Sequence, residues 1–233
     1  LSGVKKAFAW LTEKQLLEEP QDWAFYRPRV RGGGWPFQFI NSHYPDLDDT
    51  AAVAYGMHKS GDRCFDNPVQ RAAEWICGMQ SKNGGFASFD ADNDHTYLNE
   101  IPFADHGALL DPPTEDVSAR CAMLLSRLGD SEAFRSVKRK CLEYLLRSQE
   151  PDGSWYGRWG TNYIYGTWSV LMALEEEGLG IEHEAVRRGV AWLNSVQRAD
   201  GGWGEGCDTY FEPSKRGQAE RSTGEQAQDG PRD

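Results

Sequence analysis

Three aspartates, Asp46, Asp48 and Asp49, lie within four residues of the sequence, directly after Pro45. Carboxyl groups this close cannot all ionise at low cost, so one of them can keep its proton near neutral pH and act as a general acid. On a helix, Asp46 and Asp49 lie on nearby faces and Asp48 points elsewhere. A working acid requires Asp48 to be protonated and aimed into an apolar space, with Asp46 or Asp49 ionised. The structural alternative is an N-cap with an acidic first turn, which the helix dipole favours.

Large aromatic side chains are frequent around these acids. A ring face stabilises a cation held against it by roughly 0.5–2 kcal/mol without reacting with it, so rings around an acid suit carbocation chemistry. The alternative is ordinary core packing, which accounts for most large apolar side chains. The rings concerned are Trp35, Phe37, Phe39, Phe86, Phe89, Trp155, Tyr156, Trp159, Tyr163 and Tyr165.

A repeat runs along the chain and must position these residues. Each copy has a Gln that is followed by Gly and a large aromatic residue, and the first copy carries a longer insert. A Gln side chain can bond main-chain groups at a helix end, and the aromatic ring can lie over the next turn, so we interpret the motif as structural. The pairs are Gln15 with Trp35, Gln80 with Phe86, Gln149 with Trp155, and Gln197 with Trp203.

Two helices are predicted for each repeat, and strand patterning is nearly absent. Apolar residues at helical spacing precede each Gln, as in Ala72, Trp75, Ile76 and Met79. A second helix is predicted over 46–61, 114–129 and 163–178, each closing at a Gly. Closing a barrel of such pairs needs about five or six of them, and this chain supplies roughly three and a half. We predict an all-α fold, an incomplete α/α barrel (toroid) of helix pairs over residues 1–213.

Composition excludes several classes of protein. The charge of −11, from 25 basic and 36 acidic residues, argues against a general nucleic-acid binder, which must neutralise phosphates. The sequence contains no run of about 18 apolar residues, so it predicts no membrane-spanning helix. Residues 214–233 contain no Ile, Leu, Val, Met or aromatic residue, so we expect a polar, disordered tail, from an aberrant or truncated C-terminus.

Two motifs suggest metals and are discounted. Asp90, Asp92 and Asp94 resemble the start of a calcium loop, but the Gly and Glu that the loop requires later are replaced by His and Ile. Asp105 and His106 suggest a metal ligand or base, but no His of the chain falls in zinc spacing. We expect no metal and no other cofactor.

Several longer segments together resemble squalene–hopene cyclases, which are class II triterpene cyclases. They are PDLDDTA, GGFASFDADND, IPFADHGALLDPPTEDVSAR, DGSWYGRWGTNYIYGTW and DGGWGEGC. The repeated Gln–aromatic segments resemble the QW motifs of that family, and the resemblance covers about residues 5 to 213. It implies two α/α barrels with a lipid-accessible cavity between them. It also implies proton-initiated cyclisation of squalene to pentacyclic triterpenes of the hopene or hopanol type.

The resemblance also implies roles for individual residues. Asp48 is the implied proton donor, and Asp46 and Asp49 support it. Asp116 and Arg120 match an acidic–basic pair that tunes the acid, with His in some members where this chain has Arg120. For the substrate, Phe37, Phe89 and Trp159 match rings that line the cavity. The catalytic set is Asp46, Asp48, Asp49, Asp116, Arg120 and Tyr165, and the substrate-binding set is Trp35, Phe37, Phe89, Trp159 and Tyr163.

The expected partners are squalene or a similar polyprene and no nucleic acid. A homodimer is compatible with the family. In the complete enzyme we expect peripheral contact with the cytoplasmic side of a bacterial membrane. The resemblance implies a second barrel before Leu1 and a further repeat after 213, so we expect this chain to be inactive alone.

Two other functions stay open and two are disfavoured. A cyclase for another polyprene, and a non-catalytic helical repeat that binds a lipid or protein, are both compatible with the sequence. An oxidosqualene cyclase is disfavoured because Leu47 stands where that group has Cys. A prenyltransferase β-subunit would need zinc ligands that the sequence does not supply.

Overall fold

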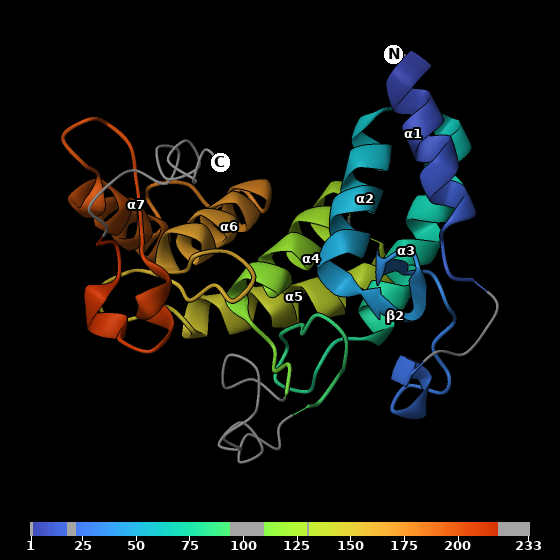
Figure 1. Cartoon of the computed structure of the whole chain (residues 1–233), viewed down its shortest axis with the longest axis horizontal. Helices are drawn as coiled ribbons and strands as arrows, with labels where there is room; N and C mark the ends of the chain where they lie inside the picture. The colour runs from blue at the N-terminus through green and yellow to red at the C-terminus, as the bar shows by residue number, and fades with distance from the viewer. Residues whose placement is uncertain (1, 18–21, 94–109, 130, 219–233) are drawn as a thin grey trace, which may run out of the picture.

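The computed structural model describes residues 2–17, 22–93, 110–129 and 131–218, and helices dominate it (Figure 1). The α-helices are α1 (Ser2–Glu13), α2 (Leu47–Lys59), α3 (Asp66–Gly78), α4 (Glu115–Arg127), α5 (Glu132–Arg147), α6 (Tyr163–Glu176) and α7 (Glu184–Val196). Short 3-10 helices are η1 (Asp22–Phe25), η2 (Arg63–Phe65), η5 (Cys207–Tyr210) and η6 (Pro213–Lys215).

The helices form two rows. In the core row, α4 packs against α2 on one side and α6 on the other. In the flanking row, α3 packs on α2, α5 on α4 and α7 on α6. The core row corresponds to the helices predicted over 46–61, 114–129 and 163–178, and the flanking row to those that precede each Gln. The prediction of a repeated helix pair is therefore confirmed.

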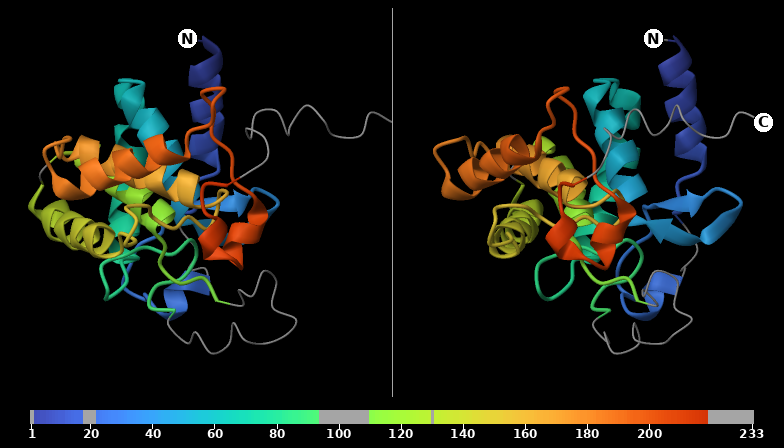
Figure 2. Two further views of the ribbon diagram at one scale, coloured as in Figure 1. Left: turned by 90° about the vertical axis from the view of Figure 1, so that its left-hand side faces the viewer. Right: turned by 60° about the vertical axis from the view of Figure 1, so that its left-hand side comes forward.

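A β-hairpin, which the all-α prediction missed, leads directly into α2. Strand β1 (Trp35–Gln38) pairs antiparallel with β2 (Asn41–Asp46), with Trp35 opposite Asp46 and an irregularity between Pro36 and Gln38. Figure 2 shows the two arrows beside the helices. Proline favours extended backbone in the residue before it and cannot donate within a helix, so Pro36 and Pro45 keep this segment extended until α2 begins.

Each repeat Gln ties its own turn to the flanking helix of the next repeat. The Nε2 of Gln80 donates to the carbonyl of Gly84 in its turn (2.8 Å) and to that of Val137 in α5 (2.8 Å). Within the described residues, Gln197 makes only the first type of bond, to Gly201 (2.8 Å). These bonds confirm the structural interpretation of the repeat. The double donation recurs from Gln15 to Gly33 and Pro68, and from Gln149 to Gly153 and Ala185.

Glycine is required in these turns for two reasons. Gly84 and Gly153 have φ of +94° and +102°, in the left-handed region that favours glycine. A Cβ on Gly84 would lie 2.4 Å from the carbonyl oxygen of Lys140, and one on Gly153 would lie 2.6 Å from that of Arg188. The turn therefore lies directly against the next flanking helix.

The closing aromatic residues Trp35 and Trp155 each fix two helices at once. The indole N–H of Trp155 donates to the carbonyl of Leu145 in α5 (2.7 Å), and its backbone N–H donates to the hydroxyl of Thr167 in α6 (2.9 Å). We call the second bond the hydroxyl clamp. It recurs from Trp35 to Thr50 and from Phe86 to Ser118, both at 2.8 Å, and all three hydroxyl residues are fully buried.

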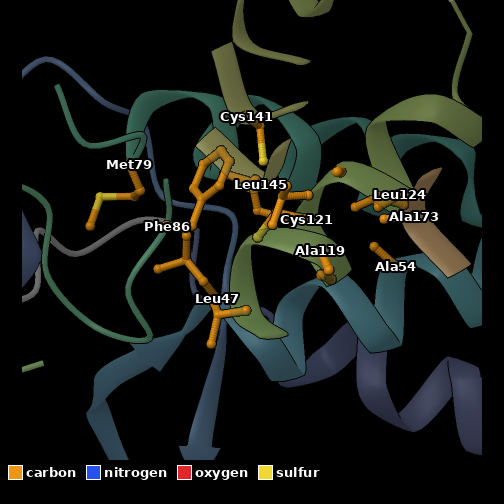
Figure 3. Packing of buried hydrophobic residues seen from close by; sticks show 14 of the residues in the cluster. Leu47, Ala54, Met79, Phe86, Ala119, Cys121, Leu124, Cys141, Leu145 and Ala173 are labelled. Atoms are coloured by element: carbon orange, nitrogen blue, oxygen red, sulfur yellow. The ribbon is translucent and has the colours of Figure 1, made fainter. Parts of the chain in front are cut away.

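The main core joins both rows, and its residues anchor the start of α2. Figure 3 shows Leu47 of α2, Phe86, and Leu145 of α5 in one buried cluster that extends to Ala173 of α6. Leu47 is 1% exposed and precedes Asp48, so burial of its side chain fixes the first turn that carries the acids.

Part of the predicted tail is packed. Within η6 and the residues after it, the guanidinium of Arg216 lies 4.4 Å from the ring centre of Tyr163, and the N–H of Gly217 donates to Glu205. Arg216 and Gly217 of the predicted tail therefore contact earlier parts of the chain, residues 219–233 lie outside the described residues, and the boundary at residue 213 stays a prediction. In the described ranges, no helix has the length and apolar character needed to cross a membrane.

Candidate active site

The N-terminus of α2 is capped by the first of the three acids. Asp46 Oδ1 accepts the backbone N–H of Asp49 at 2.6 Å. Asp48 and Asp49 follow in the first turn, so the structural alternative holds for Asp46 itself. The cap leaves Asp48 available for contacts with the other core helices.

Arg120 links Asp48 to Tyr165 across the core row. The Nε of Arg120 in α4 lies 3.0 Å from Asp48 Oδ1 in α2. Its Nη2 donates to the hydroxyl of Tyr165 in α6 at 2.9 Å, and its guanidinium lies 5.9 Å from the centre of that ring. One cation thus connects three helices, and the structure brings these three predicted catalytic residues together.

The hydroxyl clamps tie the first turns of the core helices to the turns that precede them. The residue two positions before each clamp hydroxyl is the second or third residue of its helix. That place holds two carboxylates and one phenol. The pairs of presented residue and clamp are Asp48 with Thr50, Asp116 with Ser118, and Tyr165 with Thr167.

Burial raises the pKa of every acid in the motif. Burial, opposed by the N–H of Asp49, raises the pKa of Asp46 to about 8. Burial also raises the pKa of Asp48 to about 6, although the charge of Arg120 lowers it. The pKa of Asp49 is raised by burial and lowered by the same arginine. The pKa of Asp46 is thus raised further than that of Asp48, and the predicted division of charge among the three acids stays a prediction.

Asp116 serves the neighbouring loop and does not pair with Arg120. Its carboxylate is 1% exposed and accepts the backbone N–H groups of Arg158 (2.9 Å) and Trp159 (2.8 Å) through Oδ2. Its Oδ1 accepts from the hydroxyl of Thr114 and the N–H of Val117. The ion pair of Arg120 is made with Asp48, so the acidic–basic pair implied by the resemblance is not a direct contact.

Three of the predicted rings, Phe37, Phe89 and Trp159, lie in a line that we call the ring row. Phe37 and Phe89 meet edge to face at 6.3 Å between ring centres, and Phe89 and Trp159 do so at 6.1 Å. Phe37 is 54% exposed and Trp159 is 44% exposed. The rings come from β1 and from the loops before α4 and α6, so the row joins three repeats and leaves ring surface open to a ligand.

Trp35 and Tyr163 are not part of this row. Trp35 is 1% exposed, and its indole N–H donates to the carbonyl of Leu11, as its place in the repeat requires. Tyr163 is 4% exposed and is covered by Arg216 and the ring of Tyr156. Both predicted substrate contacts are buried structural residues here.

Two hollows lie near these groups. A groove of about 400 Å³ is lined by Phe37 and Phe89 together with polar residues that include Asp111. A smaller pocket of about 70 Å³ lies between α2, α4 and α6, where Arg120 and Trp168 line it. Asp48 lines neither of these two hollows.

Sequence reasoning missed Asp111 and Arg158, which contact the residues of the ring row. The only signals were that Asp111 precedes two prolines and that Arg158 precedes Trp159. Of the discounted metal motifs, Asp92 pairs with Arg27 at 2.8 Å. Asp94, Asp105 and His106 lie outside the described residues. In the described part of the chain, no cluster of three or more His, Cys, Asp or Glu could hold a metal.

The sequence profile described as the squalene-hopene cyclase C-terminal domain matches residues 2–229. The chain belongs to this family. The squalene–hopene cyclase of Zymomonas mobilis is 53% identical over 209 residues, which cover 88% of this chain and 32% of that protein. That of Alicyclobacillus acidocaldarius is 40% identical over 215 residues, which cover 91% of this chain and 34% of that protein.

This squalene–hopene cyclase domain thus spans about a third of the length of those curated relatives. Among solved structures, the type II terpene cyclase MstE from Scytonema, a variant in complex with its substrate geranylgeranyl dihydroxybenzoate, has a TM-score of 0.56. It is 21% identical and the match covers 86% of this chain and 50% of that one, so the likeness concerns the fold.

Proposed function

We propose that this chain is the acid-bearing part of a squalene–hopene cyclase, and that Asp48 protonates a terminal alkene of squalene. The observation that carries the proposal is the connection of Asp48 through Arg120 to Tyr165, at the start of three core helices. Family membership adds the substrate class, because the relatives that match most of this chain bear the name squalene–hopene cyclase.

Arg120 is suited to strengthen the acid at the moment of transfer. An alkene is a very weak base, so its protonation needs an acid whose conjugate carboxylate is stabilised. A guanidinium 3.0 Å from Asp48 supplies that stabilisation as the proton leaves, and it needs little movement to do so. Burial acts in the opposite direction and keeps a fraction of Asp48 protonated below and around its pKa of about 6.

The ring row is suited to the cation that protonation creates. Each ring face contributes roughly 0.5–2 kcal/mol to a cation against it and does not capture it. A polyprene held in a folded shape loses less entropy as successive rings close. The cation ends by loss of a proton, which gives a hopene, or by capture of water, which gives a hopanol.

We also propose that the helix pairs form part of an α/α barrel, and that the complete enzyme takes its substrate from a membrane. The two rows of paired helices support the first idea. The low water solubility of squalene supports the second idea, and we propose the cytoplasmic face of a bacterial membrane as the location of the complete enzyme.

The proposal is tested by replacing the corresponding segment of the Zymomonas mobilis enzyme with this chain. We expect the chimera to convert squalene to pentacyclic products, identified by gas chromatography and mass spectrometry. Asp48→Asn should lower the turnover rate roughly 10²- to 10⁴-fold, which is the usual contribution of a general acid. The control is Asp66→Asn in the first turn of α3, whose carboxylate is 66% exposed and, among the residues that the structure describes, pairs with Arg63 alone.

Full turnover by the Asp48→Asn chimera, with the same circular dichroism spectrum, would overturn the assignment of the acid. Turnover of another polyprene in place of squalene would change the proposed substrate and would leave Asp48 as the proposed acid. The chain alone is expected to give no product, and rapid cyclisation by it would show that the remaining two thirds of the relatives are dispensable.

A further inference from the structure

The loop before α4 contains a buried carboxylate that the proposed chemistry does not use. Asp111 Oδ2 accepts the backbone N–H of Ser88 at 2.6 Å and that of Phe89 at 2.9 Å. A carboxylate that accepts two backbone N–H groups makes charge-assisted bonds, which are stronger than neutral ones. The backbone of a ring-row residue is therefore fixed by a side chain more than twenty residues away in the sequence.

The same bonds reach the helix that carries the acids. While the N–H of Phe89 is bound by Asp111, the carbonyl of the same peptide group, which belongs to Ser88, accepts the N–H of Leu47 at 2.8 Å. Leu47 is the first residue of α2 and precedes Asp48. One peptide group thus connects Asp111 to the turn on which the acid lies.

The other oxygen of Asp111 faces the second end of the ring row. Arg158 Nε lies 3.9 Å from Asp111 Oδ1, and its Nη2 donates to the carbonyl of Leu110 at 3.1 Å. The guanidinium lies 5.5 Å from the ring centre of Trp159. Arg158 therefore contacts the Asp111 loop and the Trp159 ring at the same time.

From these contacts we infer that Asp111, with Arg158, is a positioning pair that holds Phe89 and Trp159 at a fixed place relative to Asp48. The inference rests on the proposed function for what the rings do. The pair touches no reacting atom of the proposed cyclisation. It acts by limiting how far the ring row moves from the acid while the cation migrates.

Two properties of the site favour this role over simple loop stability. Asp111 and Phe89 line the same groove of about 400 Å³, so Asp111 lies at a surface that a ligand can reach. Asp116 separately binds the N–H groups of Arg158 and Trp159, so the loop before α6 has its own anchor. Loss of Asp111 should therefore loosen residues 88–89 and the Trp159 ring without releasing that loop.

The first experiment uses the chain itself and does not depend on turnover. Hydrogen exchange of backbone amides is measured by NMR for wild type, Asp111→Ala, Asp111→Asn and Asp90→Ala. Asp90 is the matched control, because it lines the same groove and its side chain bonds only Asn93 among the described residues. We expect exchange at Ser88 and Phe89 to rise at least tenfold in Asp111→Ala, to rise less in Asp111→Asn, whose amide oxygen still accepts, and to stay unchanged in Asp90→Ala.

The second experiment measures products from the same variants in the chimera with squalene. A loosened ring row should raise the share of partly cyclised hydrocarbons several-fold in Asp111→Ala, while substrate is still consumed in a reaction that needs Asp48. A purely structural defect would lower all products in proportion. Arg158→Met should raise the same share without changing exchange at residues 88–89.

Unchanged exchange at Ser88 and Phe89 in Asp111→Ala overturns the inference, and so does an unchanged product ratio in an active chimera. An equal effect of Asp90→Ala also overturns it, because the effect would then belong to charge in the groove. If no chimera, wild type included, converts any polyprene, the proposed function fails, and the exchange data still decide whether Asp111 fixes the loop.

Discussion

Replacement of Arg120 by Met should raise the pKa of Asp48, because the variant removes the nearest positive charge and keeps a side chain of similar length. At 3.0 Å the attraction is about 5 kcal/mol with an effective dielectric constant of about 20. Both side chains are partly exposed, at 30% and 25%, so solvent reduces this value. An arginine beside an aspartate usually lowers its pKa by ~1–3. From a value of about 6, the pKa of Asp48 should rise to roughly 7–8.

The measurement is a pH titration of the Asp48 side-chain carboxyl carbon by NMR in the chain itself, with Asp48→Asn used for assignment. Arg120→Lys is the control: it keeps a positive charge and should leave the pKa near 6 while breaking the bond to Tyr165. In an active chimera, the pH above which turnover declines should move upward with the pKa of Asp48. A pKa that stays at 6 or falls in Arg120→Met would refute the argument that this arginine tunes the acid.

Two further predictions concern stability. Gln149→Met removes the bonds donated to Gly153 and Ala185 and the bond accepted from Arg188, and it should cost ~2–3 kcal/mol of unfolding free energy, against ~1 kcal/mol for Gln197→Met, which loses one bond among the described residues. Urea denaturation measures both, and equal losses would contradict the bridging role. Stability should also fall as pH rises from about 4 to about 8, because burial raises the pKa of Asp46 to about 8 and that of Asp48 to about 6, so the folded state binds more protons than the unfolded chain in this window. Each carboxyl contributes a slope of at most ~1.4 kcal/mol per pH unit, and Asp46→Asn should flatten the curve between about pH 6 and pH 8; an unaltered curve would show that Asp46 is ionised when folded.

The helices and the repeat could be predicted because their signals are local. Apolar spacing and a closing Gly define α3 and α4 within the sequence itself, and the Gln of three repeats (Gln80, Gln149 and Gln197) makes its first bond only four residues away. The β-hairpin before α2 could not be predicted in this way, because its pairing depends on two prolines and on contacts with the helices.

The candidate site was only partly predictable for the same reason. The three acids lie within four residues, so the sequence alone shows that they cluster. Burial raises the pKa of each of them in the structure. The partner of Asp48 depends on how α2, α4 and α6 are packed, and no local pattern states whether Arg120 pairs with Asp48 or Asp116. Trp35 is an aromatic residue of the type that can line a substrate cavity, but its position in the repeat buries it in the core.

The hydroxyl clamps have a consequence for how such a centre can change. Thr50, Ser118 and Thr167 make the same bond although the residue two positions before each is an acid, an acid and a phenol. The clamp bond is thus compatible with either group, because it is made by the backbone and a hydroxyl two positions away. At Asp48 and Tyr165, single codon changes can alter reactivity and leave the clamps in place, whereas Asp116 also anchors the loop before α6.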